Sequence, residues 1–230
     1  MDNQKATNQD QSFRGRTLDD KIQIVIIWLL RVIALIVSIF SIVTHGNIEL
    51  ILICMIGLLL LFLPDIIEYR YNVSLPMEYS FLIVGFMFSS IFLGELGDYY
   101  EKFWWWDDVL HLSAGVMTGF AGFLLLYTLV VSKRLQAGLF IVSFLAFGIA
   151  ALFGVTWEIV EFTFDRTIGT NMQNGSLSDT MFDLIIDLVG ASISITAGYF
   201  FLKSQRRTGL FSSFINNFIQ SNPHLKNRKK

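Results

Sequence analysis

The fold is decided by two long uncharged stretches in the middle of the chain. The first is Val109–Ser132, VLHLSAGVMTGFAGFLLLYTLVVS, and the second is Leu135–Trp157, LQAGLFIVSFLAFGIAALFGVTW. An α-helix of roughly 20 apolar residues crosses the hydrocarbon core of a bilayer, and both stretches exceed that length. Neither shows the strict alternation of apolar and polar residues found in transmembrane β-strands. The sequence therefore predicts an all-α, polytopic transmembrane helical bundle.

The composition and the rest of the chain agree with this class. Of the 230 residues, 53% are hydrophobic and 16% are charged, whereas soluble domains average about 25% charged residues. We expect the bundle to occupy residues 21–203, between a disordered tail over residues 1–20 and an interfacial amphipathic helix with a basic tail over residues 204–230. Hydrophobic periodicity predicts six helices, over residues 22–43, 48–68, 79–96, 108–132, 137–163 and 180–203.

The distribution of lysine and arginine predicts the orientation of the bundle. Six spans place both termini on one side of the membrane, and most of the 17 basic residues fall on that side. Because basic loops stay in the cytoplasm, we expect both termini to be cytoplasmic. The opposite, outer side carries only Lys102 and Arg166. Arg31 lies within the first span, where we expect it to clamp a carboxylate for structural reasons.

Acidic residues gather at the outer ends of the last three predicted helices. Spacings of three and four residues place the acids of each helix on one face, together with a histidine in the first of the three. Because the three faces share the outer end, we expect them to converge on one site. The set comprises Asp107, Asp108, His111, Glu158, Glu161, Asp165, Asp179, Asp183 and Asp187.

Carboxylates with one imidazole suit a divalent cation, and we expect Mg²⁺ or Mn²⁺ ahead of Ca²⁺ or Zn²⁺. In this interpretation His111 and Glu158 move protons as catalytic residues, whereas Gln173, Lys102 and Arg166 bind the substrate. Two other interpretations stay open. One is a polar core that shares protons or salt bridges, and the other is helix capping, which accounts only for acids in a first helical turn. The metal ligands in the first interpretation are Asp107, Asp108, Glu161, Asp165, Asp179, Asp183 and Asp187.

Three neighbouring features bear on the same region. Gly115 and Gly119 form a Gly-x-x-x-Gly step, which predicts a close contact with another helix. The polar loop over residues 169–176 is expected to lie over the site, as a lid or as a simple connector. The aromatic run Trp104–Trp106 is typical of the belt that aromatic side chains form at a membrane surface.

The polar residues of this region follow one another in the order Asp107/Asp108…His111, Glu158-x-x-Glu161, Gln173 and Asp179…Asp183…Gly190-Ala191. Over about residues 95–200 this order resembles the VanZ-like membrane family and, in a longer form, the YjdF-type inner-membrane proteins. The resemblance implies the bacterial plasma membrane and a site, but no reaction. VanZ-like proteins are implicated in resistance to glycopeptide antibiotics such as teicoplanin. They usually carry Gln where Glu161 stands, and often Lys where Asp108 stands.

Three functions stay open at this point. The first is a metal-dependent membrane enzyme that acts on a lipid-linked or cell-envelope substrate at the outer face. The second is a cation or proton transport protein, although transporters usually have related halves and the sequence shows no internal repeat. The third is a noncatalytic membrane protein involved in envelope or antibiotic tolerance. We expect the lipid bilayer and a lipid-linked small molecule as partners, and no nucleic acid.

Overall fold

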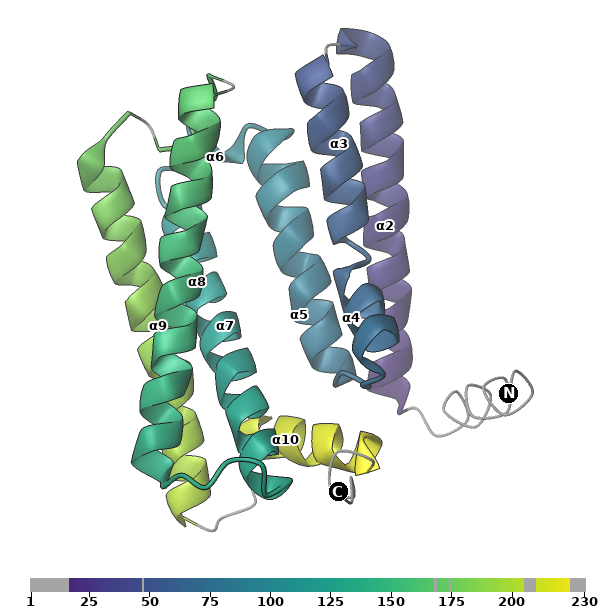
Figure 1. Ribbon diagram of the computed structural model, residues 1–230. Helices are drawn as coiled ribbons and strands as arrows, with labels where there is room; N and C mark the ends of the chain where they lie inside the picture. The colour runs from purple at the N-terminus through teal and green to yellow at the C-terminus, as the bar shows by residue number, and fades with distance from the viewer. Residues whose placement is uncertain (1–16, 47, 168, 174, 205–209, 224–230) are drawn as a thin grey trace. The chain divides into compact units, whose positions relative to one another are not determined.

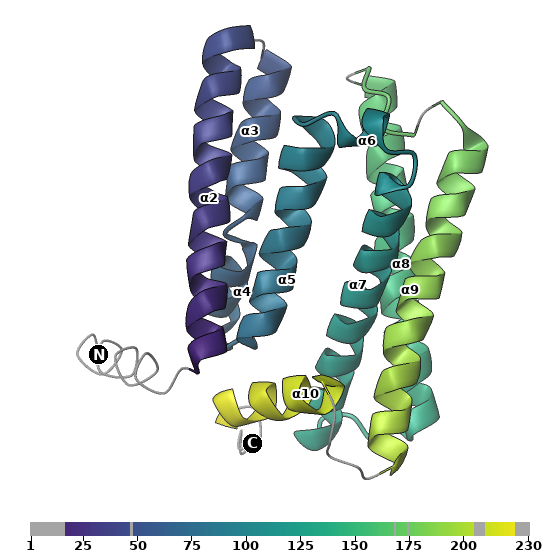
Figure 2. The same ribbon diagram turned by 180° about the vertical axis from the view of Figure 1, so that it is seen from behind.

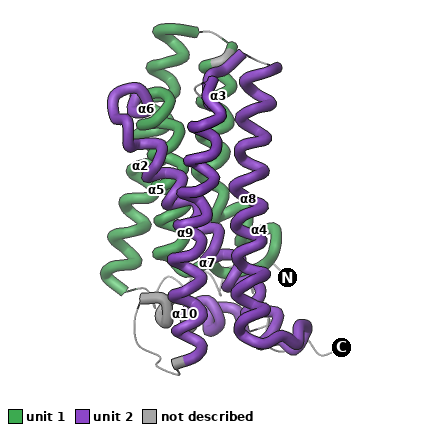
Figure 3. The backbone as a smooth tube through the Cα atoms, turned by 90° about the vertical axis from the view of Figure 1, so that its left-hand side faces the viewer, with its two compact units in different colours: residues 1–97 green, residues 98–230 purple. Residues whose placement is uncertain are grey.

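The computed structural model describes residues 17–46, 48–167, 169–173, 175–204 and 210–223. These residues form helices joined by short connections, with no strand among them (Figures 1 and 2). They belong to two compact units, residues 1–97 and residues 98–230 (Figure 3). The all-α prediction is confirmed, and the single domain over residues 21–203 stays a prediction.

Five helices within the described residues are long and apolar enough to cross a membrane, and a bent pair of shorter helices adds a sixth candidate span. This confirms the predicted multi-pass helical architecture. The bent pair consists of α3 (Ile48–Leu60) and α4 (Leu63–Tyr71). The five other spans are α2 (Leu18–His45), α5 continued by η1 (Met77–Met87 and Phe88–Glu95), α7 (Trp106–Val131), α8 (Leu139–Thr167) and α9 (Leu177–Ser204).

Helix α2 begins at Leu18, earlier than the sequence predicted, because a capping box starts it. The hydroxyl of Thr17 accepts a hydrogen bond from the backbone N–H of Asp20 at 3.2 Å, and the carboxylate of Asp20 accepts one from the N–H of Thr17 at 2.8 Å. These two bonds satisfy two helix N–H groups that have no partner within the helix. The assignment of residues 18–20 to a disordered tail was therefore wrong. Residues 1–16 lie outside the described residues.

The prediction of one continuous helix over residues 48–68 was also wrong, because α3 and α4 meet at 51°. Pro64 lies in the first turn of α4, where its ring removes a backbone N–H and clashes with the preceding turn. Arg31 of α2 fills the break. Its Nε and Nη2 donate to the carbonyl oxygen of Leu61 at 3.3 and 3.0 Å, and Nη2 also pairs with the carboxylate of Asp65. The expectation that Arg31 clamps a carboxylate is confirmed.

The first unit packs around apolar side chains from α2, α5, η1 and the break between α3 and α4. Helix η1 is a π-helix, in which a backbone N–H bonds to the carbonyl five residues earlier, as Leu96 does to Ile91 at 3.0 Å. This π-helical segment contributes Phe88 and Phe92, whose rings stack on each other in the core. The buried residues of the core are Ile27, Ala34, Leu61, Val84, Phe88 and Phe92.

The second unit is built on α7, α8 and α9, which pack against one another (Figure 2). Glycines set the contact between α7 and α9. A Cβ atom on Gly115 would meet the backbone of Asp187, and one on Gly119 would meet Ala191 and Ser194. The predicted close helix contact at Gly115 and Gly119 is confirmed. This packing brings the start of α7 beside the start of α9.

Helix α10 (Leu210–Ser221) follows α9 and packs against it. Its apolar side chains Ile215 and Phe218 are buried, as expected from the helical spacing of apolar residues in this segment. The helix lies within the segment 204–230 for which an amphipathic helix was predicted. Its position at the membrane surface stays a prediction. The basic tail over residues 224–230 lies outside the described residues.

Candidate metal centre

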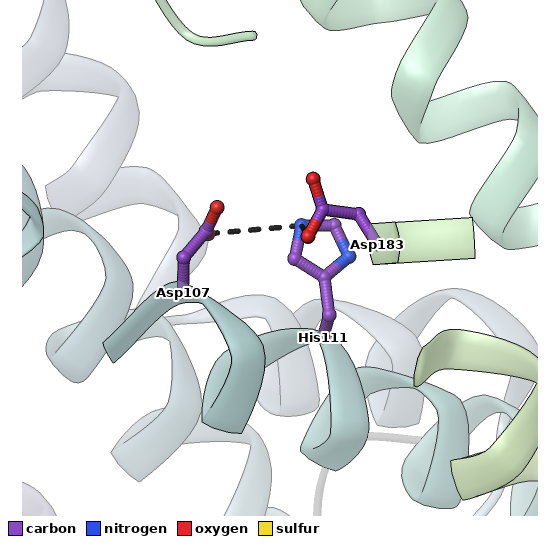
Figure 4. A group of neighbouring side chains, drawn as sticks. All are labelled: Asp107, His111 and Asp183. Carbon is purple, nitrogen blue, oxygen red and sulfur yellow. Dashed lines mark ion pairs between the residues drawn. The ribbon is translucent and has the colours of Figure 1, made fainter. Parts of the chain in front are cut away.

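His111 lies at the centre of a group of acidic side chains contributed by α7 and α9. Its Nε2 atom is 3.7 Å from Oδ1 of Asp107, one turn earlier on α7, and 4.0 Å from Oδ1 of Asp183 on α9 (Figure 4). One ligand atom from each of the three residues lies within 4.8 Å of the other two. His111 and Asp183 are buried, whereas Asp107 is half-buried.

The other ring nitrogen of His111 faces a different acid. Nδ1 is 3.4 Å from Oδ1 of Asp187, one turn beyond Asp183 on α9. Asp187 is buried, and its Oδ1 atom has no hydrogen-bond partner in the described part of the chain. At 3.4 Å the contact is longer than an ordinary N–H···O hydrogen bond, and we describe it as an electrostatic contact.

Helix α8 adds two further buried acids, Glu158 and Glu161. Both interact electrostatically with His111 and with Asp107. Oε2 of Glu158 accepts a hydrogen bond from Nε2 of Gln173 at 3.2 Å, whereas Oε1 is buried without a partner in the described residues. Acids from all three helices therefore interact electrostatically with one another around His111.

The carboxylate of Asp165 binds the loop that follows α8, whereas the sequence predicted it among the metal ligands. Its carboxylate accepts hydrogen bonds from the hydroxyl of Thr170 at 2.7 Å and from the backbone N–H groups of Met172 and Gln173 at 2.8 and 3.0 Å. Both carboxylate oxygens are used in these bonds, so Asp165 orders the loop after α8. That loop in turn carries the Gln173 amide to Glu158.

Four other predicted site residues lie at the edge of the group or bind elsewhere. Asp108 and Asp179 interact electrostatically with Asp107, and the N–H of Asp179 donates to the Ser176 hydroxyl at 3.4 Å, in the manner of a helix cap. The two cations have contacts outside the group. Lys102 pairs with Asp98 at 3.5 Å, and the guanidinium of Arg166 lies 5.4 Å from the ring centroid of Phe162.

One residue of the group was not predicted. A Cβ atom on Gly154 of α8 would lie 2.5 Å from Oδ2 of Asp187, so the absence of a side chain there leaves room for this carboxylate. Gly154 is four residues before Glu158, and it therefore lies on the same face of α8. That spacing was visible in the sequence.

The group around His111 contains more acidic side chains than cationic ones. Four buried acids and the half-buried Asp107 surround one imidazole, and no ion pair with lysine or arginine joins them in the described part of the second unit. Buried carboxylates without a counter-charge are costly at membrane depth. Either a bound cation or shared protons must offset their mutual repulsion.

Two of the separations in the group can be compared with those between ligands of a small divalent ion. Two atoms bonded to an ion at about 2.1 Å lie roughly 3.0 Å apart at a right angle and roughly 4.2 Å apart across the ion. The contacts of Nε2 with Asp107 and Asp183, 3.7 and 4.0 Å, fall within this range.

Comparisons with known proteins identify the family but describe no reaction. An uncharacterized protein of Thermotoga maritima is 29% identical over 152 residues, which make up 65% of this chain and 74% of the relative. No solved structure matches the chain. Residues 26–204, which include the whole group around His111, match the family described as "Predicted membrane protein (DUF2238)". The chain therefore belongs to this family of predicted membrane proteins, the YjdF family.

Proposed function

We propose that the protein binds a divalent cation through Asp107, His111 and Asp183, and that it uses this ion to act on a lipid-linked or cell-envelope substrate at the outer face of the bacterial plasma membrane. The observation that carries the proposal is the convergence of three ligand atoms within 4.8 Å of one another. A further buried oxygen without a hydrogen-bond partner in the described residues, Oε1 of Glu158, supports it.

The donor set selects among divalent ions. Carboxylate oxygens suit Mg²⁺ and Mn²⁺, whereas an imidazole nitrogen suits the first-row transition metals. Mn²⁺ satisfies both preferences and is the first candidate, followed by Mg²⁺. Three protein ligands leave coordination positions for water and for an oxygen atom of a substrate.

The negative charge around His111 favours a substrate with an oxygen atom that binds the metal ion directly. A phosphate would be repelled by the buried acids of the group unless a metal bridged it, because like charges repel. A bound ion would polarise a phosphoryl or carbonyl oxygen. We assign proton transfer in such a reaction to Glu158, because one of its oxygens accepts from Gln173 and the other has no partner in the described residues.

Metal content tests the proposal directly. Wild-type protein in lipid nanodiscs is compared by mass spectrometry with the Asp183→Asn variant, and with Asp98→Asn as the matched control. Asp98 is an exposed acid of the same unit that pairs with Lys102. We expect about one divalent ion per wild-type chain, loss of that ion in Asp183→Asn, and its retention in Asp98→Asn.

The contrary result has a definite meaning. If the wild type contains no metal, and Mn²⁺, Mg²⁺ and Zn²⁺ leave its thermal unfolding unchanged, the metal proposal fails. The buried acids would then share protons, and the transport function would be tested next by proton and cation flux in proteoliposomes. A positive metal result would justify a screen of lipid phosphates as substrates.

A further inference from the structure

We propose that Asp187 is a positioning residue and not a ligand of the ion: it orients the ring of His111, and Gly154 provides the space that its carboxylate occupies. This inference rests on the proposed function, because it concerns how the same group holds its metal. It changes the role of Asp187 from the metal ligand expected from the sequence.

The two nitrogens of the His111 ring are used on opposite sides. Nε2 faces Asp107 and Asp183 at 3.7 and 4.0 Å, whereas Nδ1 faces Asp187 at 3.4 Å. A histidine that binds a metal through one nitrogen usually directs the N–H of the other toward a carboxylate or a carbonyl, which fixes the ring and its tautomer. With the proton on Nδ1, the lone pair of Nε2 points toward Asp107 and Asp183.

The position of Asp187 outside the ligand group agrees with this role. The three residues whose ligand atoms lie within 4.8 Å of one another are Asp107, His111 and Asp183. Asp187 contacts the imidazole from the Nδ1 side. Its Oδ1 is buried and has no hydrogen-bond partner in the described residues, so a modest closing of the 3.4 Å gap would give the Nδ1–H group its acceptor.

Glycines on two helices enclose Asp187. A Cβ atom on Gly154 of α8 would lie 2.5, 3.2 and 3.3 Å from Oδ2, Cγ and Cβ of Asp187. On the other side, a Cβ atom on Gly115 of α7 would meet the backbone of Asp187, 2.9 Å from its carbonyl carbon and 3.0 Å from its Cα. The carboxylate therefore fills the space that a side chain at position 154 would take.

The test measures binding of Co²⁺ as a spectroscopic probe and of Mn²⁺ by titration, with full-length protein in nanodiscs. The variants are Asp187→Asn, Gly154→Ala and Asp183→Asn. Gly148→Ala is the matched control, because Gly148 lies on the same helix and a Cβ atom there would have no neighbour within 4 Å. Thermal unfolding of each variant shows whether it is folded.

We expect Asp187→Asn to bind one ion with the wild-type Co²⁺ absorption spectrum but with roughly 10–100-fold lower affinity, as loss of a partner behind a ligand does. Gly154→Ala should lower the affinity in the same way, and the double variant should lose less than the sum of the two effects, because both act through one contact. Gly148→Ala should bind as the wild type does. Asp183→Asn, which loses a ligand, should change the spectrum or the stoichiometry.

Two results would overturn the inference while the proposed function survives. One is wild-type affinity in Asp187→Asn. The other is a change of Co²⁺ spectrum or stoichiometry in Asp187→Asn that equals the change in Asp183→Asn, which would make Asp187 a ligand. If Gly154→Ala does not fold, Asp187→Asn decides alone. A wild-type protein that binds no metal would instead refute the proposed function, and this inference with it.

Discussion

Replacing Gly115 with alanine is expected to destabilise the second unit, because the contact at this position is between two backbones. The added Cβ atom would meet the carbonyl oxygen of Asp187 and would lie 2.9 Å from its carbonyl carbon and 3.0 Å from its Cα. Ordinary contacts between carbon atoms are about 3.5–4.0 Å. No side-chain rotation can relieve this clash, so α7 and α9 have to move apart by roughly 0.5–1 Å.

The magnitude follows from two opposing effects. Overpacking of a tight contact costs about 1–3 kcal/mol, and replacing glycine by alanine within a helix returns about 0.5–1 kcal/mol. The free energy of unfolding of Gly115→Ala is therefore expected to fall by up to about 2.5 kcal/mol. Because the clash is with Asp187 itself, and His111 lies one turn away on α7, the same shift should also weaken metal binding.

Gly148→Ala supplies the reference for this measurement. A Cβ atom there has no neighbour within 4 Å, so only the helix propensity acts, and the variant should equal or exceed the wild type by up to about 1 kcal/mol. The assay is reversible unfolding of both variants in the same detergent or nanodisc, followed by circular dichroism. A Gly115→Ala protein as stable as Gly148→Ala would refute the packing argument for α7 and α9.

Three further predictions concern other parts of the chain. Arg31→Met should lower the free energy of unfolding by about 1–3 kcal/mol, since it leaves the carbonyl at the α3–α4 break without a donor. Asp65→Asn should lower it by less than about 1 kcal/mol, because the Asp65 side chain is 57% exposed. Equal losses for the two variants would contradict this. Asp165→Asn should speed hydrogen exchange at the loop amides that its carboxylate holds, and unchanged exchange rates would remove its ordering role. In a Cys54→Ala background, the Asn171→Cys variant should react with an impermeant maleimide added outside intact cells. Reaction only after the cells are lysed would reverse the predicted orientation.

The helical spans could be predicted from the sequence because hydropathy and length alone determine whether a segment can cross a bilayer. The break between α3 and α4 was missed although its signal was present. Pro64 stands inside the predicted helix 48–68, and a proline inside a helical pattern ends or kinks the helix. The π-helix η1 had no comparable signal in the sequence, and its side chains Phe88 and Phe92 lie in the core of the first unit.

The candidate site was predictable to the extent that helical spacing determines which residues share a face. Spacing placed Asp107 with His111, and it placed Glu158 with Glu161. The same rule assigned Asp165 to the site, but its carboxylate binds loop backbone that follows it in the chain. Local hydrogen bonds of this kind compete with any role on a helix face, and spacing within the helix contains no information about the loop.

The glycines and the polar residues of the three helices form one arrangement. On each helix a glycine lies one turn from a polar residue of the group, on the side away from the helix end that carries the group. These glycines are Gly115 after His111, Gly190 after Asp187, and Gly154 before Glu158. Gly115 and Gly190 also pack against each other across α7 and α9, since a Cβ atom on Gly190 would lie 3.2 Å from the carbonyl carbon of Gly115. The backbones of α7 and α9 therefore approach each other closely just beyond the polar group. The loop that Asp165 orders, and in which Gln173 contacts Glu158, lies at the opposite end of the group.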